Sequence, residues 1–233
     1  MSASPDTVVA KLSNVTRDYE TDAGVVHALA GVSLEVNAGE MLAIAGPSGS
    51  GKSTLLGLLG ALDKVTSGEI EVEGRQLNAL SPSDSAQLRR DRIGFIFQAY
   101  NLIPVLTAIE NVEYVMLLQG KDKQARRARA VEVLQAVGLG ELVDRRPNEL
   151  SGGQQQRVAV ARALAANPAL ILADEPTANL DSKTANDLLD MMVELNETLG
   201  MTFVFSTHDP MVMERAGRVI RLRDGKIEAE ERA

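Results

Sequence analysis

The sequence contains no cysteine, which excludes disulfide bonds and fits a reducing compartment such as the cytoplasm. It also lacks any apolar run that approaches the roughly 18 residues of a membrane-spanning helix. The stretch from Met1 to Asp6 has neither the basic nor the apolar region of a signal peptide. We therefore expect a cytoplasmic chain that does not itself enter a membrane.

The chain also lacks an excess of positive charge. Its 24 Lys and Arg residues face 32 Asp and Glu residues, which gives a formal net charge of −8. Non-specific nucleic-acid binding needs a basic face, so we expect no nucleic-acid partner. The cluster Arg126, Arg127 and Arg129 has two interpretations, a nucleic-acid patch or a solvated helix face, and the acidic surroundings favour the second.

What the chain does contain is ordinary for a globular protein. Its 233 residues are 45% hydrophobic, which is enough for one large domain or two tightly joined subdomains. Strand-like and helix-like patterns alternate along the sequence. The alternation at 68–74 indicates a half-buried antiparallel strand. We expect further short strands at 32–36, 93–97, 169–173 and 202–205.

Two later stretches have the periodicity of amphipathic helices. In the stretch 122–137, we expect one side to carry Ala125, Ala128, Val131, Leu134 and Val137. In the helix that precedes Gly200, we expect the inward side to carry Leu188, Leu189, Met192, Leu195 and Leu199.

The order of these patterns predicts a single α/β domain that spans residues 1–233. Residues 1–98 and 166–233 would form a core with a mixed sheet and an N-terminal antiparallel β subdomain. Residues 99–165 would form an inserted α-helical subdomain.

Residues 46–53 read Gly-Pro-Ser-Gly-Ser-Gly-Lys-Ser and lie between an apolar strand and a stretch that suits a helix. This is the context in which a glycine-rich loop cradles the phosphates of a nucleotide. The glycines let backbone N–H groups approach phosphate, and the positive end of the helix faces the same anion. Lys52 is placed to reach the β- and γ-phosphates and Ser53 to bind Mg²⁺. The nucleotide-binding candidates are Gly46, Pro47, Ser48, Gly49, Ser50, Gly51, Lys52, Ser53 and Thr54.

A second candidate for anion binding begins at Ser151, which is followed by Gly152, Gly153 and Gln154 and by a helix that ends near Pro168. Ser151 is a natural N-cap, and glycines at a helix start leave N–H groups free for an anion. Capped helix starts are common, so this run alone leaves a purely structural interpretation open. Beside a phosphate loop that already holds the nucleotide, it favours contact with the nucleotide of a second copy. Head-to-tail pairing by a two-fold axis would create two identical composite sites.

The run Leu170-Ile-Leu-Ala ends in Asp174 and Glu175, so an apolar strand closes with two carboxylates. Ligands bind at such strand ends in open α/β folds. Asp174 suits the Mg²⁺ shell, and Glu175 suits the activation of the attacking water. A pair of charges that merely closes a strand is the alternative, and the phosphate loop favours the functional interpretation.

In this order, the phosphate loop, the run Leu-Ser-Gly-Gly-Gln and the Asp-Glu strand end resemble the ATP-binding subunits of ABC transporters over nearly the whole chain. The resemblance implies a P-loop NTPase fold with a RecA-like core, ATP and Mg²⁺ as cofactors, and ATP hydrolysis. It identifies Gln98 as the glutamine that contacts Mg²⁺ or water, and His208 as the histidine that reaches the γ-phosphate. Together with Glu175 and Lys52 they form the expected catalytic set, and Ser53, Gln98 and Asp174 the expected metal set.

The same resemblance places Asp181 in a segment that crosses the dimer interface. Tyr19 matches the aromatic residue that stacks on adenine, although a tyrosine in a short strand can also simply pack. Ala178 stands where glycine is frequent, a change that we expect to leave the chemistry intact. We expect a structural role for His27.

Within the family, the segments 15–19, 97–112 and 206–210 resemble the lipoprotein-release and macrolide-efflux type, that is, LolD-like and MacB-like ATPases. This resemblance implies integral membrane transporter subunits as partners. It also implies a place at the inner face of the cell membrane, with membrane contact only through those partners.

Three other functions compete with a transporter motor. A soluble ABC ATPase that acts on DNA or ribosomes usually has paired ATPase domains or a long coiled-coil insertion, and neither is present here. A non-transporting ATPase that regulates a membrane partner in cell-wall or cell-division control is hardly separated from the motor by sequence. A simple P-loop kinase would have no use for the helix start at Ser151.

Overall fold

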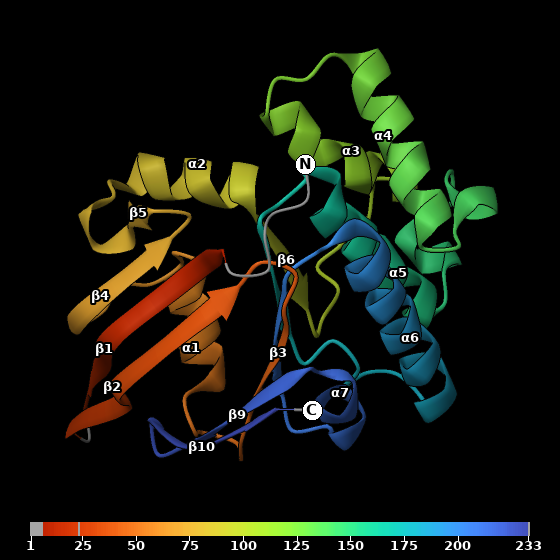
Figure 1. Cartoon of the computed structure of the whole chain (residues 1–233). Coiled ribbons are helices and arrows are strands. Elements are labelled where there is room, and N and C mark those ends of the chain that lie inside the picture. Colours follow the sequence, from red (N-terminus) through yellow and green to blue (C-terminus); the bar gives the residue numbers. More distant parts are fainter. Residues whose placement is uncertain (1–6, 23, 233) are drawn as a thin grey trace.

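The computed structural model describes residues 7–22 and 24–232. They form two β-sheets and a group of helices (Figure 1). The four-stranded sheet is antiparallel and has the order β2-β1-β4-β5. Its strands are β1 (Val8–Thr21), β2 (Gly24–Asn37), β4 (Ser67–Val72) and β5 (Arg75–Gln76).

The six-stranded sheet has the order β10-β9-β3-β8-β7-β6. Five of its strands are parallel, and β10 pairs with β9 in the antiparallel direction. The strands are β3 (Met41–Ala45), β6 (Ile93–Phe97), β7 (Leu170–Asp174), β8 (Phe203–Thr207), β9 (Arg218–Arg223) and β10 (Lys226–Arg232). This sheet is therefore mixed, as the sequence predicts.

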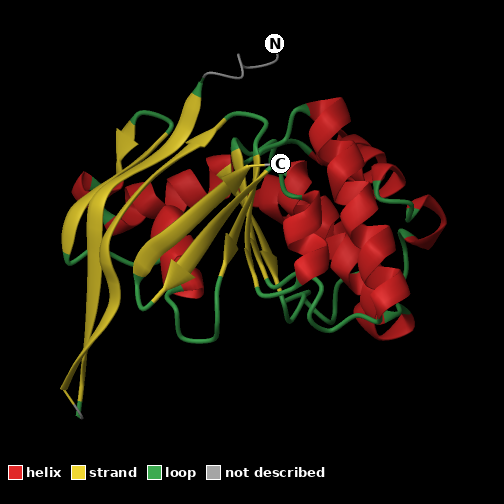
Figure 2. Ribbon diagram, turned by 60° about the horizontal axis from the view of Figure 1, so that its bottom comes forward, coloured by secondary structure: helices red, strands yellow, loops and turns green. Residues whose placement is uncertain are grey.

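Helices cover both faces of the six-stranded sheet. In Figure 2 the antiparallel sheet lies on one side of the molecule and most of the helices lie on the other. The helices are α1 (Lys52–Leu59), α2 (Pro82–Arg92), α3 (Ala108–Leu118), α4 (Lys123–Ala136), α5 (Gly152–Ala165), α6 (Ser182–Leu199) and α7 (Pro210–Arg215). Short 3₁₀ turns occupy Leu77–Ala79, Gly140–Leu142 and Pro147–Glu149.

Two hydrophobic clusters hold these layers together. The first fills the space between the two sheets and includes Leu55 and Leu58 of α1. The second lies under the helices α3 to α6 on the opposite face. Strand β8 serves both, because Val204 belongs to the first cluster while Phe203 and Phe205 belong to the second. Burial of both faces explains why its first three residues, Phe203 to Phe205, are all apolar.

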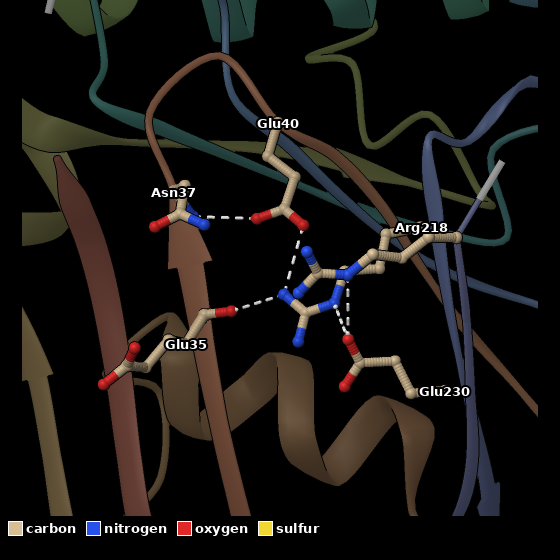
Figure 3. A network of polar contacts seen from close by, with 6 residues as sticks. Glu35, Asn37, Glu40, Arg218 and Glu230 are labelled. Carbon is tan, nitrogen blue, oxygen red and sulfur yellow. Dashed lines mark hydrogen bonds and ion pairs between the residues drawn. The ribbon is translucent and has the colours of Figure 1, made fainter. Parts of the chain in front are cut away.

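An ion-pair network centred on Arg218 joins the two sheets at the amino ends of the parallel strands (Figure 3). The Arg218 side chain, of which 10% is exposed, donates to Glu230 Oε1 at 2.9 Å, to Glu40 Oε1 at 3.2 Å and to the Glu35 carbonyl at 2.8 Å. The Asn37 N–H donates to the other oxygen of Glu40 at 2.8 Å. These four contacts connect β2, β9, β10 and the turn before β3.

The predicted inward faces of two helices need correction. Ala125 and Ala128 are exposed, whereas the buried residues of this stretch are Ala130, Val133, Leu134 and Val137. A constant spacing of three residues rotates by about 60° per step, so the predicted set could not stay on one side of a helix. In α6, Leu199 is 56% exposed because it is the last residue of the helix, while its other predicted inward residues are buried.

Helix α2 was not predicted. Its start carries a recognisable signal, because Ser81 accepts a hydrogen bond from the Asp84 N–H and Pro82 occupies the first helical position. Helices α3, α4 and α5 lie within the range 99–165, and the boundaries of a separate helical subdomain stay a prediction.

Candidate functional site

Four neighbouring parallel strands bring the candidate residues to one edge of the sheet. Strands β3, β8, β7 and β6 follow one another in the sheet, so their carboxyl ends lie side by side. The glycine-rich loop follows β3, His208 follows β8, Glu175 follows β7 and Gln98 follows β6. All four segments line a single cavity of about 530 Å³.

The conformation of the glycine-rich loop depends on close backbone packing. Gly51 has a φ of +104°, and a Cβ at this position would lie 2.4 Å from the Ala28 carbonyl oxygen. Only glycine fits there. The loop then turns into α1, whose first residue is Lys52, so the positive end of this helix faces the cavity.

Lys52 is buried and lies across the loop. Its ammonium donates hydrogen bonds to the carbonyl oxygens of Gly46 at 2.8 Å and Pro47 at 3.0 Å. Among the described residues it has no carboxylate as an ion-pair partner. A phosphate oxygen would supply the missing negative charge, so the position suits triphosphate binding.

The Ser53 hydroxyl lies 3.2 Å from Asp174 Oδ1. A hydroxyl and a carboxylate oxygen are hard ligands of the kind that Mg²⁺ prefers, so these two residues fit the expected cation. The described part of the chain holds no cluster of three His, Cys, Asp or Glu residues that could bind a metal ion unaided. A cation at this position would take further ligands from other oxygen donors, such as phosphate, water and the expected Gln98.

Glu175 and His208 form the polar centre of the cavity. Nδ1 of His208 lies 2.7 Å from Glu175 Oε1, while Glu175 Oε2 is buried without a hydrogen-bond partner among the described residues. The backbone of Glu175 has a φ of +47°, and its N–H donates to the Ser206 carbonyl at 2.9 Å. Left-handed backbone at a non-glycine residue costs about 1–3 kcal/mol and persists where the surroundings enforce it. The unpaired oxygen is suited to accept a proton from a water molecule.

Gln98 is exposed and its side chain lines the same cavity. The backbone carbonyl oxygen of Gln98 accepts a hydrogen bond from Asn179 Nδ2 at 2.9 Å. This bond ties the segment after β6 to the segment after β7. Asp181 does not line the cavity and instead caps α6 by accepting a hydrogen bond from the Thr184 N–H at 3.0 Å.

The start of α5 lies outside this cavity. Ser151 Oγ accepts from the Gln154 N–H at 3.3 Å, and Gln154 Oε1 accepts from the Ser151 N–H at 2.9 Å, which together form a capping box. Gly153 is required for packing against α6, because a Cβ there would lie 2.2 Å from Thr184 Cγ2. The structure thus brings the glycine-rich loop, Gln98, Glu175 and His208 together and leaves the Ser151 helix start apart from them.

Tyr19 does not line the cavity. Its hydroxyl donates to Asp63 Oδ2 at 2.7 Å, and the Arg17 guanidinium carbon lies 4.3 Å from the centre of its ring. Burial raises the pKa of the Asp63 carboxyl, but hydrogen bonds from Tyr19, the Lys64 N–H and Arg17 outweigh it and hold this pKa below its usual value. Tyr19 pairs in register with Val26, which does line the cavity. Stacking on adenine therefore stays a prediction.

His27 is a cavity residue that the sequence did not reveal. Its Nδ1 lies 2.8 Å from Asp18 Oδ1, which agrees with the expected structural role, yet the residue also lines the cavity beside the glycine-rich loop. The pairing of the two long strands β1 and β2 brings it there. Recognition of the complete β1–β2 hairpin would have been the signal for it.

A parallel sheet that presents a glycine-rich phosphate loop at its carboxyl edge defines the class of P-loop nucleoside triphosphatases. The family model described as "ABC transporter" matches residues 29–178. The chain belongs to the ABC transporter family, in which it is an ATP-binding and ATP-hydrolysing cassette.

Relatives and solved structures agree with this assignment. An uncharacterized ABC transporter ATP-binding protein of Thermotoga maritima is 50% identical over 224 residues, which cover 96% of this chain and 95% of the relative. The macrolide export ATP-binding/permease protein MacB of Salmonella typhimurium is 48% identical over 221 residues, which cover 95% of this chain but only 34% of the relative. The resemblance to ABC transporter ATP-binding subunits, including the macrolide-efflux type, is confirmed.

The fold is confirmed by the solved dimeric structure of a post-hydrolysis state of the ATP-binding cassette MJ0796 bound to ADP and Pi. It has a TM-score of 0.88 and 47% identity to this chain, with coverage of 96% of this chain and 98% of that one. The relative named MJ0796 comes from Methanocaldococcus jannaschii and is 48% identical over 226 residues, which cover 95% of this chain and 96% of the relative. Within the described residues, no helix has both the length and the apolar character that a membrane crossing needs.

Proposed function

We propose that two copies of this chain pair head to tail around two ATP molecules and drive an integral membrane transporter subunit, of the efflux or lipoprotein-release type. The observation that carries the proposal is the separation of two elements in one chain. One cavity holds the glycine-rich loop with Glu175 and His208, and the capped helix start at Ser151 lies outside it. The dimeric state of the MJ0796 cassette, 47% identical to this chain, supports a second copy as the partner of that helix start.

The residues of the cavity divide the chemistry among them. Lys52 exchanges its two carbonyl contacts for oxygens of the β- and γ-phosphates. Ser53 and Asp174, together with Gln98, would hold Mg²⁺, which would neutralise charge on the phosphate oxygens. Glu175 accepts the proton of the attacking water at its unpaired Oε2, and His208 and Gln98 orient the reacting groups.

The partner's Ser151 helix start completes the site. Because Ser151 Oγ accepts from Gln154 within the capping box, its own O–H stays free to donate to the γ-phosphate of the other copy. The free N–H groups of this helix start add to the same contact. Each protomer is net acidic, so two copies repel each other. We propose that the contacts of each bound nucleotide with both copies overcome this repulsion.

The variant Glu175→Gln tests this division of roles. It keeps the size of the side chain but removes the base, so we expect hydrolysis to fall at least about a hundredfold. Without hydrolysis the ATP-bound dimer should accumulate and be detected by size-exclusion chromatography. Glu194→Gln, an exposed change on α6, is the control and should behave like the wild type. A Glu175→Gln protein that stays monomeric with ATP and hydrolyses it at the normal rate would overturn the proposal.

A groove between β6 and the helices α3 and α5 offers a binding site for the proposed membrane partner. It has a volume of about 460 Å³ and is lined by Phe95, Phe97, Tyr114 and Leu118 among others. Leu117 and Leu118 of α3 are more than half exposed, and Leu118 lines the groove. Arg162 also lines the groove, and burial lowers the pKa of its guanidinium.

We assign this groove to an amphipathic helix of the membrane subunit, with its apolar face on the phenylalanines and a carboxylate on Arg162. The MacB relatives are named as combined ATP-binding and permease proteins, and this chain spans about a third of their length. The permease part of those names supports a membrane permease as the partner of this cassette, which would place the chain at the inner face of the membrane. Leu118→Asp should abolish co-purification with the detergent-solubilised membrane subunit while ATP binding persists. Retention of the complex would contradict this assignment.

A further inference from the structure

A buried glutamine on α5 connects the helix start at Ser151 with both catalytic loops. Gln156 is fully buried and lies two residues beyond the capping box of Ser151 and Gln154. Its Nε2 donates to the Pro176 carbonyl at 2.8 Å and makes a longer contact of 3.4 Å with the Phe97 carbonyl. Carbonyl oxygens only accept, so the nitrogen of the amide must face both of them.

The two acceptors have a special place in the chain. The Pro176 carbonyl directly follows Glu175, and the Phe97 carbonyl directly precedes Gln98. One amide group therefore holds the backbone beside both residues that are expected to act on the attacking water. The bond between Asn179 and the Gln98 carbonyl joins the same two loops a second time. The loops are thus tied to each other and, through Gln156, to α5. Arg162 of α5 also donates to the Tyr100 and Asn101 carbonyls, so Gln156 is the tie that reaches both loops.

The start of α5 lies at the other end of this connection, and in the proposed dimer it contacts a different nucleotide from the one that the catalytic loops act on. In the proposed dimer, the start of α5 contacts the triphosphate of the partner, whereas Glu175 and Gln98 act on the triphosphate of their own chain. A shift of α5 on contact with the partner's nucleotide would pull on the Pro176 and Phe97 carbonyls. The backbone at Glu175 is left-handed, and its Oε2 is unpaired, so this loop depends on such ties for its position.

We propose that Gln156 is a positioning residue that makes the loops of Glu175 and Gln98 follow α5 when this helix contacts the partner's nucleotide. The inference rests on the proposed function. It adds a route by which nucleotide binding at one composite site of the dimer changes the position of the catalytic loops at the second site.

The variant Gln156→Met tests the proposal, because methionine keeps the length and shape of the side chain without its donor. It also removes Gln156 Oε1, a buried oxygen without a partner among the described residues, so the variant should fold. We expect kcat for ATP hydrolysis to fall about tenfold, the effect of one lost buried hydrogen bond, while KM changes less than twofold. Gln155→Met is the matched control, because Gln155 donates only to the Leu150 carbonyl, away from both catalytic loops.

Hydrogen exchange separates positioning from a merely structural role. In the ATP-trapped Glu175→Gln dimer, we expect ATP to protect the amides at 151–155, 97–101 and 175–179. In the double variant Glu175→Gln/Gln156→Met, protection should persist at 151–155, be lost at 175–179 and fall at 97–101, where the hydrogen bonds from Arg162 of α5 remain. Unchanged loop protection, or a kcat within twofold of that of Gln155→Met, would overturn the inference.

A second variant keeps the test decisive if Gln156→Met does not fold. Gln156→Glu places a carboxylate against two carbonyls, which repels them, but its protonated form can donate one hydrogen bond. Burial raises the pKa of such a carboxyl, so its kcat relative to wild type should recover as the pH is lowered from about 8 to 6. A flat ratio would contradict the proposal. If Glu175→Gln itself retained normal hydrolysis, the proposed function would fail first, and the two failures are thereby distinguished.

Discussion

The two ends of the six-stranded sheet satisfy their polar groups in opposite ways. At the amino ends of the parallel strands, Arg218 is paired with Glu40 and Glu230, and further hydrogen bonds complete the network (Figure 3). At the carboxyl ends, the buried atoms Ser50 Oγ, Glu175 Oε2 and Ser206 Oγ have no partner among the described residues. One end uses its polar groups to join the two sheets. The other leaves these buried oxygens unpaired, and Glu175 lines the cavity.

The largest effect should come from breaking the ion-pair network at the amino ends of the parallel strands, which we call the paired end. Arg218→Met leaves the carboxylate of Glu40, of which 14% is exposed, without its cation. We expect a loss of about 3 kcal/mol in the free energy of unfolding, measured by urea denaturation, because an uncompensated buried charge remains. ATP binding by the folded protein should stay normal.

The control for this variant lies on the same strand. Arg221→Met removes an ion pair with Glu231 in which both side chains are about half exposed. It should lower the stability by less than about 1 kcal/mol. Equal losses for Arg218→Met and Arg221→Met would show that the buried network has no special role.

Substitutions at the carboxyl ends of the parallel strands, where the cavity lies, should change the ATPase function rather than the stability. Lys52→Ala removes an ammonium whose hydrogen-bond acceptors among the described residues are two carbonyls. We expect ATP turnover to fall at least about a hundredfold, equivalent to about 2.7 kcal/mol, and the thermal stabilisation by ATP to disappear. The free energy of unfolding without nucleotide should change by about 1 kcal/mol or less. A large loss of stability in the absence of ATP would contradict the comparison between the two ends.

Ser206 offers a smaller test in the direction of greater stability. Its hydroxyl is buried and has no hydrogen-bond partner in the part of the chain that the structure describes, so Ser206→Ala should raise the free energy of unfolding by about 1 kcal/mol. The neighbour Thr207 is equally buried, but its hydroxyl accepts from the Asp209 N–H at 2.9 Å. Thr207→Val should therefore destabilise by a similar amount. The unfolding temperatures of Ser206→Ala and Thr207→Val compare the loss of an unbonded hydroxyl with the loss of a bonded one. If both variants shifted the unfolding temperature in the same direction, the difference between the two hydroxyls would be refuted.

The smallest effect concerns the pH dependence of the paired end. The hydrogen bond from Arg218 lowers the pKa of Glu230 below its ordinary value of 4.5. Its stabilising contribution is therefore present above about pH 4.5 and is lost as the pH falls through the lowered pKa. Because 40% of this side chain is exposed, the contribution should stay below about 1 kcal/mol. Glu230→Gln should flatten the loss of stability below pH 4.5, and an unchanged slope would exclude this cause.

The sequence by itself determined the parts of this protein that depend on neighbours along the chain. The glycine-rich loop, the capped start of α5 at Ser151 and the strand that ends at Asp174 are local patterns, and each has the predicted conformation. Propensity, capping and glycine geometry act over a few residues, so a motif of eight residues was sufficient to recognise the loop.

Only the tertiary structure decided which segments meet. The strand order β3-β8-β7-β6 places Gln98, Glu175 and His208 around one cavity, and long-range burial determines that order. The same holds for the buried face of α4, for His27 in the cavity wall and for the contacts of Gln156 with two distant carbonyls. Such contacts join residues up to tens of positions apart, and no local pattern encodes the partner, because many alternative partners share the same chemistry until the core is packed.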